Sequence, residues 1–310
     1  MMKLLIAGSF PSSEEQLDRI TRLGYEMILH RDERGPLPEE ALDAEAVICN
    51  GLFFYHDIGQ FKKLRFIQLT SAGMDRVPLE AVRTRGIRLE NAVDVYSTPC
   101  AEWAVLKILE IYKKSAAFYK AQSSLTWEKR EDLLELTDKT AAIIGFGHIG
   151  QAIARRLKAF GVNIIAVQRR EASAEAAALA DEVAVVADME RILGRSDMVI
   201  LTLPYTAQTH HFIDSEKIAW MKDDCVLVNV SRGGVIHEAA LIQALSDGKF
   251  RGAALDVFDE EPLSPGSPLW TMDKVIITPH IAYVSDKAKG RLFDLILHNL
   301  DNYIRESGGA

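Results

Sequence analysis

The sequence has few cysteines, no long apolar run and no block of basic residues, and each absence excludes a class of protein. Its 3 cysteines, Cys49, Cys100 and Cys225, are widely spaced in apolar surroundings, which predicts reduced, buried thiols rather than a disulfide or metal framework. No stretch approaches the roughly 18 apolar residues of a membrane span. Lysine plus arginine at 36 against aspartate plus glutamate at 44 gives a net charge of -8, which argues against a nucleic-acid partner. We expect a cytoplasmic protein.

Apolar residues make up 48% of the 310 residues, and the chain exceeds the usual size of one compact core. Between residues 3 and 91, short apolar runs alternate with amphipathic stretches, which is typical of βα units on a parallel sheet. A second series of apolar strands runs from Thr140 to about residue 277, and a long predicted helix opens at Thr98-Pro99. We therefore predict an α/β protein with two doubly wound parallel-sheet domains.

Residues 145–150 (GFGHIG) follow a predicted strand and open a predicted helix, which is the context of a dinucleotide-binding loop. The first glycine permits a tight turn, the second lets the backbone approach a pyrophosphate, and the third lets helix and strand pack closely. The first N–H groups of the helix are available to phosphates. A glycine-rich turn without a ligand is the alternative. The predicted cofactor contacts here are Gly145, Gly147, His148, Ile149 and Gly150.

The end of the following strand bears on the choice of cofactor. An acid about 20 residues beyond the fingerprint would bind the ribose 2′-hydroxyl of NAD. The sequence has Gln168, Arg169 and Arg170 instead, and an arginine fork pairs well with the 2′-phosphate of NADP. We predict that NADP(H) is preferred and that NAD(H) is possible, unless both arginines are only solvated residues at a strand end.

Three short segments in the last third of the chain supply an arginine, an acid and a histidine. A guanidinium holds a carboxylate through two hydrogen bonds, an imidazole transfers a proton near neutral pH, and an adjacent carboxylate fixes its tautomer. Each segment follows a predicted strand, at the end where doubly wound sheets bind ligands. Arg232, His280 and an acid of residues 256–261 are therefore candidate catalytic residues for redox chemistry on an oxo acid, with a structural salt-bridge cluster as the alternative.

The ordered motifs resemble the D-isomer-specific 2-hydroxyacid dehydrogenases, a family that includes glyoxylate/hydroxypyruvate reductases and phosphoglycerate dehydrogenases. Besides the fingerprint and the three segments, the resemblance covers residues 71–75 (SAGMD), 101–103 (AEW), 203–209 (LPYTAQT) and 269–270 (LW). It implies a flavodoxin-like substrate domain of residues 1–97 plus 284–310. It also implies a Rossmann nucleotide-binding domain of residues 98–283.

The resemblance implies roles for individual residues as well. Arg232 would hold the substrate carboxylate and carbonyl, His280 would donate the proton, and Glu261 would be the partner of His280. Ala72 and Gly73 would offer backbone N–H groups to the substrate carboxylate. Further cofactor contacts would be Pro204, Thr209, Val230, Ser231 and Asp256, the last near the nicotinamide carboxamide and the histidine.

We therefore expect a 2-oxoacid reductase that transfers a hydride from NADPH to C2 of a small substrate such as glyoxylate or hydroxypyruvate. A phosphoglycerate dehydrogenase is one alternative, and a non-catalytic NAD(P)-sensing protein of the same scaffold is another. The resemblance suggests a homodimer with contacts at the linking helix and residues 122–137, and no metal set is expected. Two departures from the family are Tyr283, which often is a small residue, and His237, which often is an acid.

Overall fold

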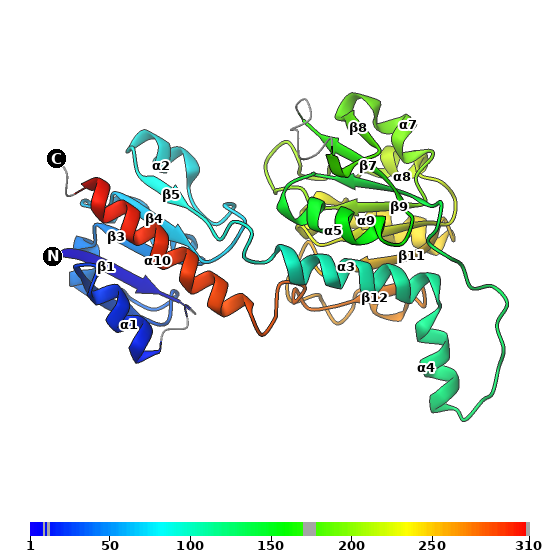
Figure 1. Ribbon diagram of the computed structural model, residues 1–310, viewed down its shortest axis with the longest axis horizontal. Coiled ribbons are helices and arrows are strands. Elements are labelled where there is room, and N and C mark those ends of the chain that lie inside the picture. The colour runs from blue at the N-terminus through cyan, green and yellow to red at the C-terminus, as the bar shows by residue number, and fades with distance from the viewer. Residues whose placement is uncertain (9, 11–12, 170–177, 308–310) are drawn as a thin grey trace. The chain divides into compact units, whose positions relative to one another are not determined.

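The computed structural model describes residues 1–8, 10, 13–169 and 178–307. It forms two compact units, unit 1 with Met1–Tyr96 and Ser285–Ala310, and unit 2 with Ser97–Val284. Each unit holds a parallel sheet with helices packed on it (Figure 1). The predicted fold class, α/β with two doubly wound parallel sheets, is confirmed.

Unit 1 contains a five-stranded parallel sheet in the order β2-β1-β3-β4-β5. Because the strand order reverses between β1 and β3, this is the flavodoxin-like arrangement, in which ligands bind near the reversal at the carboxyl ends of the strands. The strands are β1 (Met2–Ala7), β2 (Tyr25–His30), β3 (Ala46–Cys49), β4 (Phe66–Leu69) and β5 (Arg88–Glu90).

Helices cover both faces of the unit 1 sheet. On one face, α1 (Glu14–Thr21) and α10 (Ala288–Ser307) bury apolar side chains, among them Ile20 and Ile296, against β1 and β3 (Figure 1). On the other face, α2 (Leu79–Thr84) and short 3₁₀ turns complete a second core. The buried apolar strands are thus enclosed on both sides, as parallel sheets require.

Unit 2 contains a seven-stranded parallel sheet in the order β12-β11-β10-β9-β6-β7-β8. The reversal lies between β6 and β9, and the six strands from β11 to β8 have the order of a Rossmann fold, with β12 added at one edge. The strands are β6 (Thr140–Ile144), β7 (Asn163–Gln168), β8 (Glu182–Val185), β9 (Met198–Leu201), β10 (Cys225–Asn229), β11 (Phe250–Leu255) and β12 (Val275–Ile277).

The helices of unit 2 also fall on two faces. The helix predicted to open at Thr98-Pro99 is α3 (Ser97–Tyr112), and it packs with α5 (His148–Lys158). The opposite core contains side chains of α7 (Met189–Leu193), α8 (Ser215–Trp220) and α9 (Glu238–Ser246).

One helix of unit 2 is not part of either layer. The short α4 (Ser115–Ser123) projects from the end of α3 (Figure 1), and none of its residues is buried. Beyond it, Leu125 and Trp127 are each 95% exposed. Folding of this unit alone does not account for the exposure of such large apolar side chains.

The three cysteines are buried, as the sequence predicted, and each is a free thiol in the structure. Burial raises the pKa of the Cys100 thiol, and that of the Cys225 thiol, to about 12. Across the described residues, no helix is both long and apolar enough to cross a membrane. Within the same residues, no group of three or more histidines, cysteines or acids is arranged to hold a metal ion.

Candidate active site

The three chemistry-bearing segments meet at the carboxyl ends of β10, β11 and β12, which are neighbours in the unit 2 sheet. The Nδ1 atom of His280 lies 2.7 Å from Oε2 of Glu261. Arg232 precedes Gly233, which packs against the backbone of Phe258, three residues before Glu261. The structure therefore brings the three predicted residues to the same edge of the unit 2 sheet.

Glu261 is held as an anion beside the imidazole. Burial raises the pKa of Glu261, but the hydrogen bond and charge of His280 outweigh burial, and the pKa lies below its ordinary value. Its other oxygen accepts a hydrogen bond from the Phe258 N–H at 3.1 Å. An ionised carboxylate only accepts hydrogen bonds, so His280 must carry a proton on Nδ1. Nε2 is then the ring nitrogen that can contact other partners.

Asp256 fixes the loop that carries His280. Its side chain is 2% exposed, and Oδ1 accepts the Ile281 N–H at 2.9 Å while Oδ2 accepts the Ala282 N–H at 2.9 Å. Oδ1 also accepts the Thr278 hydroxyl at 2.5 Å, and the Asp256 carbonyl oxygen accepts the His280 N–H at 2.8 Å. Burial raises the pKa of Asp256 above its ordinary value despite these hydrogen bonds.

These contacts hold His280 in an unfavourable backbone conformation. Its φ of 52° lies in the left-handed region, which costs a residue other than glycine about 1 kcal/mol. The family resemblance implied that Asp256 lies near the nicotinamide carboxamide and the histidine. In the structure both carboxylate oxygens bind the loop on either side of His280, and the contact with the nicotinamide stays a prediction.

Asn229, which the sequence analysis did not single out, organises the turn before Arg232. Its Oδ1 accepts the N–H and the hydroxyl of Ser231 at 3.0 and 2.8 Å, and its Nδ2 donates to the Arg232 carbonyl at 3.0 Å. A Cβ on Gly233 would lie 1.8 Å from the Phe258 carbonyl carbon, so only glycine allows these two segments to pack together. The available signal was a polar residue at the end of an apolar strand.

The glycine fingerprint has the geometry of a phosphate-binding loop. Gly145 has φ +95°, and a Cβ on Gly150 would lie 2.6 Å from the Gly145 carbonyl oxygen. Gly147 precedes α5, and a Cβ there would meet only open space. His148 and Ile149 form the first turn of α5, whose N–H groups suit an anion. These residues fit a dinucleotide.

The residues predicted to favour NADP(H) over NAD(H) follow one another at the end of β7. The side chain of Gln168 is half-buried, and its Nε2 has no hydrogen-bond partner among the described residues. A buried amide without a partner fits the binding of a polar ligand group at this point. Arg169 is exposed. Arg170 lies outside the described residues.

The remaining predicted contacts are distributed over two strand ends of unit 2. After β9, Pro204 is exposed, and its carbonyl oxygen accepts the Thr209 hydroxyl at 2.7 Å, which closes the loop. After β10, Val230 and Ser231 are buried. β9 adjoins the reversal of the sheet and β10 is the next strand, so both contacts lie at the carboxyl edge where nucleotides bind in this fold.

In unit 1, Ala72 and Gly73 lie in the loop after β4. Their carbonyl oxygens accept hydrogen bonds from Asn91 Nδ2 at 2.6 Å and Ser71 Oγ at 2.8 Å. Within the described part of the chain, neither of their N–H groups has a hydrogen-bond partner. This arrangement suits an anion.

His237, the second departure from the family, caps a helix. Its Nδ1 accepts the Ala240 N–H at 3.2 Å at the start of α9. Its ring lies edge-on to that of His211, which stacks on His210 at 3.8 Å. Tyr283, the other departure, is edge-on to His280 with the ring centres 6.0 Å apart.

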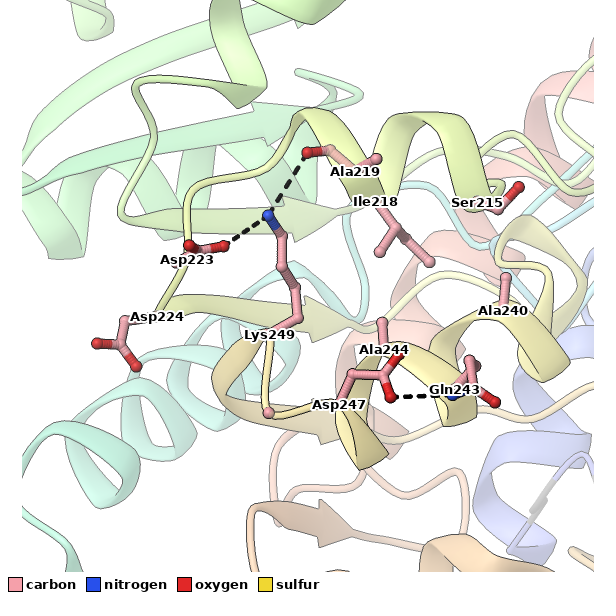
Figure 2. A pocket seen from close by; sticks show the side chains of 11 residues that line it. Ser215, Ile218, Ala219, Asp223, Asp224, Ala240, Gln243, Ala244, Asp247 and Lys249 are labelled. Carbon is pink, nitrogen blue, oxygen red and sulfur yellow. Dashed lines mark hydrogen bonds and ion pairs between the residues drawn. The ribbon is translucent and has the colours of Figure 1, made fainter.

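A separate hollow of about 670 Å³ lies at the opposite end of the unit 2 sheet (Figure 2). It is lined by α8, α9 and the segments that precede β10 and β11, and none of the candidate site residues lines it. Lys249 Nζ pairs there with Asp223 at 2.8 Å. Because it lies at the amino ends of the strands, we do not assign it to the substrate.

Comparison with known proteins gives the family. Residues 105–282 match the family model described as "D-isomer specific 2-hydroxyacid dehydrogenase, NAD binding domain". The D-3-phosphoglycerate dehydrogenase of Methanocaldococcus jannaschii is 33% identical over 308 residues, which are 98% of this chain and 58% of that relative. The chain belongs to the D-isomer specific 2-hydroxyacid dehydrogenase family.

Two further members of the family are similar over nearly their whole length. The glyoxylate reductase of Thermococcus onnurineus is 32% identical over 313 residues, 96% of this chain and 91% of that relative. The crystal structure of an NADPH-dependent glyoxylate/hydroxypyruvate reductase from Sinorhizobium meliloti, in complex with NADP and malonate, matches with a TM-score of 0.84 at 26% identity, over 97% of this chain and 93% of that one. The resemblance noted in the sequence is confirmed, although the chain spans only 58% of the phosphoglycerate dehydrogenase.

Proposed function

We propose that the chain is an NAD(P)H-dependent D-2-hydroxyacid dehydrogenase that reduces a small 2-oxo acid. The observation that carries this proposal is the contact of 2.7 Å between His280 Nδ1 and Glu261 Oε2, at the strand ends next to that of Arg232, in a chain of this family. In this assignment, residues 98–283 bind the nucleotide, and residues 1–97 plus 284–310 form the substrate domain.

The side chains of the cluster have complementary roles in this reaction. The bound nicotinamide would supply the hydride to C2 of the oxo acid. Arg232 binds the substrate carboxylate and offers positive charge to the carbonyl oxygen as negative charge develops there. His280 donates the proton on Nε2 to that oxygen, and its Nδ1 proton stays hydrogen-bonded to Glu261. The anionic Glu261 stabilises the imidazolium before the transfer.

The residues that would hold the cofactor lie at the carboxyl ends of β6, β7, β9 and β10. The first turn of α5 and the open side of Gly147 suit the pyrophosphate. The lack of an acid at Gln168, together with the exposed Arg169, supports a preference for NADPH. We expect Arg169→Ala to lower kcat/KM for NADPH about tenfold and leave that for NADH nearly unchanged. A higher kcat/KM for NADH in the wild type would contradict the preference.

The names of three relatives bear on the substrate. The relative from Thermococcus onnurineus is a glyoxylate reductase, and the structure from Sinorhizobium meliloti is that of a glyoxylate/hydroxypyruvate reductase. We therefore favour glyoxylate or hydroxypyruvate, with 3-phosphohydroxypyruvate as the alternative that the phosphoglycerate dehydrogenase relative suggests. The test is steady-state turnover of these three acids, pyruvate and phenylpyruvate with each cofactor, with His280→Ala as the inactive control. If no pair turned over, a non-catalytic cofactor-sensing protein would be the better proposal.

We also propose that the chain forms a homodimer through α3, α4 and residues 122–137. The support is the absence of buried side chains in α4 and the exposure of Leu125 and Trp127. Burial of such side chains in a symmetric interface would remove their apolar surface from water.

A further inference from the structure

A carboxylate of the chain itself occupies a backbone anion site in unit 1. Oε1 of Glu33 accepts the Asn50 N–H at 2.6 Å, and Oε2 accepts the Gly51 N–H at 2.7 Å. Two consecutive N–H groups directed at one anion form a nest. Glu33 follows β2, whereas Asn50 and Gly51 follow β3, so the contact joins two different strand ends.

The position of this nest in the sheet is that of a ligand site. Strand order reverses between β1 and β3, and doubly wound sheets bind ligands at the carboxyl ends beside such a reversal. Gly8 directly follows β1 with φ +73°, and a Cβ there would lie 2.7 Å from Glu33 Oε1. Glycine at this position therefore leaves the space that the carboxylate fills.

The nest is linked to the loop after β4. Oδ1 of Asn50 accepts a hydrogen bond from Arg76 Nη1 at 2.5 Å. Arg76 belongs to the loop that also carries Ala72 and Gly73. Because Glu33 fixes the backbone of Asn50, it also fixes where the Asn50 side chain meets Arg76. At the Glu33 end of these contacts, His56 Nε2 lies 3.0 Å from the Glu33 carbonyl oxygen.

We propose that Glu33 is a positioning residue for substrate binding, which fills the Asn50–Gly51 nest and orients the loop of Ala72 and Gly73 through Asn50 and Arg76. The inference rests on the proposed function and on the role that the family resemblance implies for the N–H groups of Ala72 and Gly73, which is to bind the substrate carboxylate. A filled nest has a second consequence. The substrate carboxylate cannot bind at Asn50 and Gly51, so it is directed to Ala72 and Gly73.

The kinetic test compares Glu33→Ala with Glu40→Ala, which removes an exposed glutamate of the same unit. We expect Glu33→Ala to raise KM for the oxo acid about tenfold and to change kcat by less than about twofold, because the loop binds ground state and transition state alike. KM for the cofactor should not change. Glu40→Ala should match the wild type in all three constants.

Chemical rescue tests the nest itself. Formate carries the carboxylate that Glu33→Ala lacks, so millimolar formate should lower KM for the oxo acid in that variant. It should not do so in the wild type, whose nest is filled. Glu33→Gln retains one acceptor but turns an amide N–H₂ toward a backbone N–H, so we expect a smaller rise in KM and no rescue.

Hydrogen exchange gives a measurement that does not depend on turnover. In Glu33→Ala, amides in residues 50–56 and in residues 70–77 should exchange about tenfold faster, and formate should slow both. Faster exchange confined to residues 50–56 would overturn the link to the substrate loop, as would a fall in kcat at constant KM. If the wild type turned over no oxo acid, the proposed function would fail, and exchange would still decide whether Glu33 sets this loop.

Discussion

Removal of the Asp256 carboxylate should reduce both stability and activity, because three donors of the His280 loop depend on it. In Asp256→Ala the N–H of Ala282 becomes a buried donor without an acceptor, which costs about 1–3 kcal/mol. Ile281 is exposed and Thr278 is half-buried, so water can replace most of their lost bonds. Part of this loss in unfolding free energy is offset, because Asp256→Ala no longer buries a charged carboxylate. We expect a net loss of about 2 kcal/mol.

The effect on activity should be larger than the effect on stability. His280 has a left-handed backbone that the contacts of Asp256 maintain, and a displacement of the general acid by 1 Å can cost about 100-fold in rate. We therefore expect kcat/KM to fall by about that factor. The assays are urea unfolding followed by circular dichroism, and initial rates of oxo-acid reduction.

Asp273→Ala is the matched control, since it removes an exposed acid from the segment before β12. It should change the unfolding free energy by less than about 0.5 kcal/mol. A loss below this value in Asp256→Ala, or a kcat/KM within threefold of the wild type, would show that Asp256 does not hold the loop.

The pH dependence gives a second check on the same residue. Because burial raises the pKa of Asp256 above its ordinary value of 3.8, the folded chain binds this proton more tightly than the unfolded chain. The contribution of Asp256 to the unfolding free energy therefore falls as the pH rises from 3.8 through the raised pKa. Asp256→Asn removes this slope. The difference in unfolding free energy between wild type and Asp256→Asn should fall across that window and be constant above it.

Three further predictions concern other side chains. Glu261→Gln should lower kcat/KM for reduction at least tenfold at pH 7.5. Because the pKa of Glu261 is lowered in the folded chain, its carboxylate stabilises the wild type above pH 4.5, and this stability is lost as the pH falls through the lowered pKa. The unfolding free energy of Glu261→Gln should lack this pH dependence. His237→Ala should lower the unfolding free energy by about 0.5–1 kcal/mol in urea unfolding, whereas His237→Asn should not, because an asparagine side chain can also accept the N–H group at the start of α9. Trp127→Ser should lower the mass measured by light scattering toward that of a monomer, whereas Phe54→Ser, an exposed aromatic of unit 1, should not.

The sequence predicted the fold because buried parallel strands leave a strong signal. Runs such as residues 141–144 and 198–201 are entirely apolar, and both are buried strands of unit 2. The glycine fingerprint was equally readable, since Gly145 and Gly150 permit contacts that a side chain would prevent. By contrast, α4 was not predicted as a separate helix. It buries no side chain, so no apolar periodicity marks it.

The candidate catalytic residues could be predicted because their chemistry restricts the choice of side chain. Oxo-acid reduction needs a cation that binds the carboxylate and a group that donates a proton near neutral pH. Few residue types besides arginine and histidine can supply these two groups, which favours Arg232 and His280. Their supports are less restricted. Asn229 needs only an amide of suitable length, and its partners lie two and three residues away in a turn that the sequence did not predict.

Asp256 and Glu33 each hold a loop that is distant from them in the sequence. Each is an acid that accepts two consecutive backbone N–H groups, Ile281 and Ala282 in one unit, Asn50 and Gly51 in the other. Each therefore accepts hydrogen bonds from N–H groups of a loop after a parallel strand, where no ladder partner is available. The donors lie 17 to 26 residues from the acid, so no local periodicity connects them. Because the same contact recurs in both units, we infer that a carboxylate from another strand end orders each of these loops, and the Asp256 and Glu33 variants test that inference in each unit.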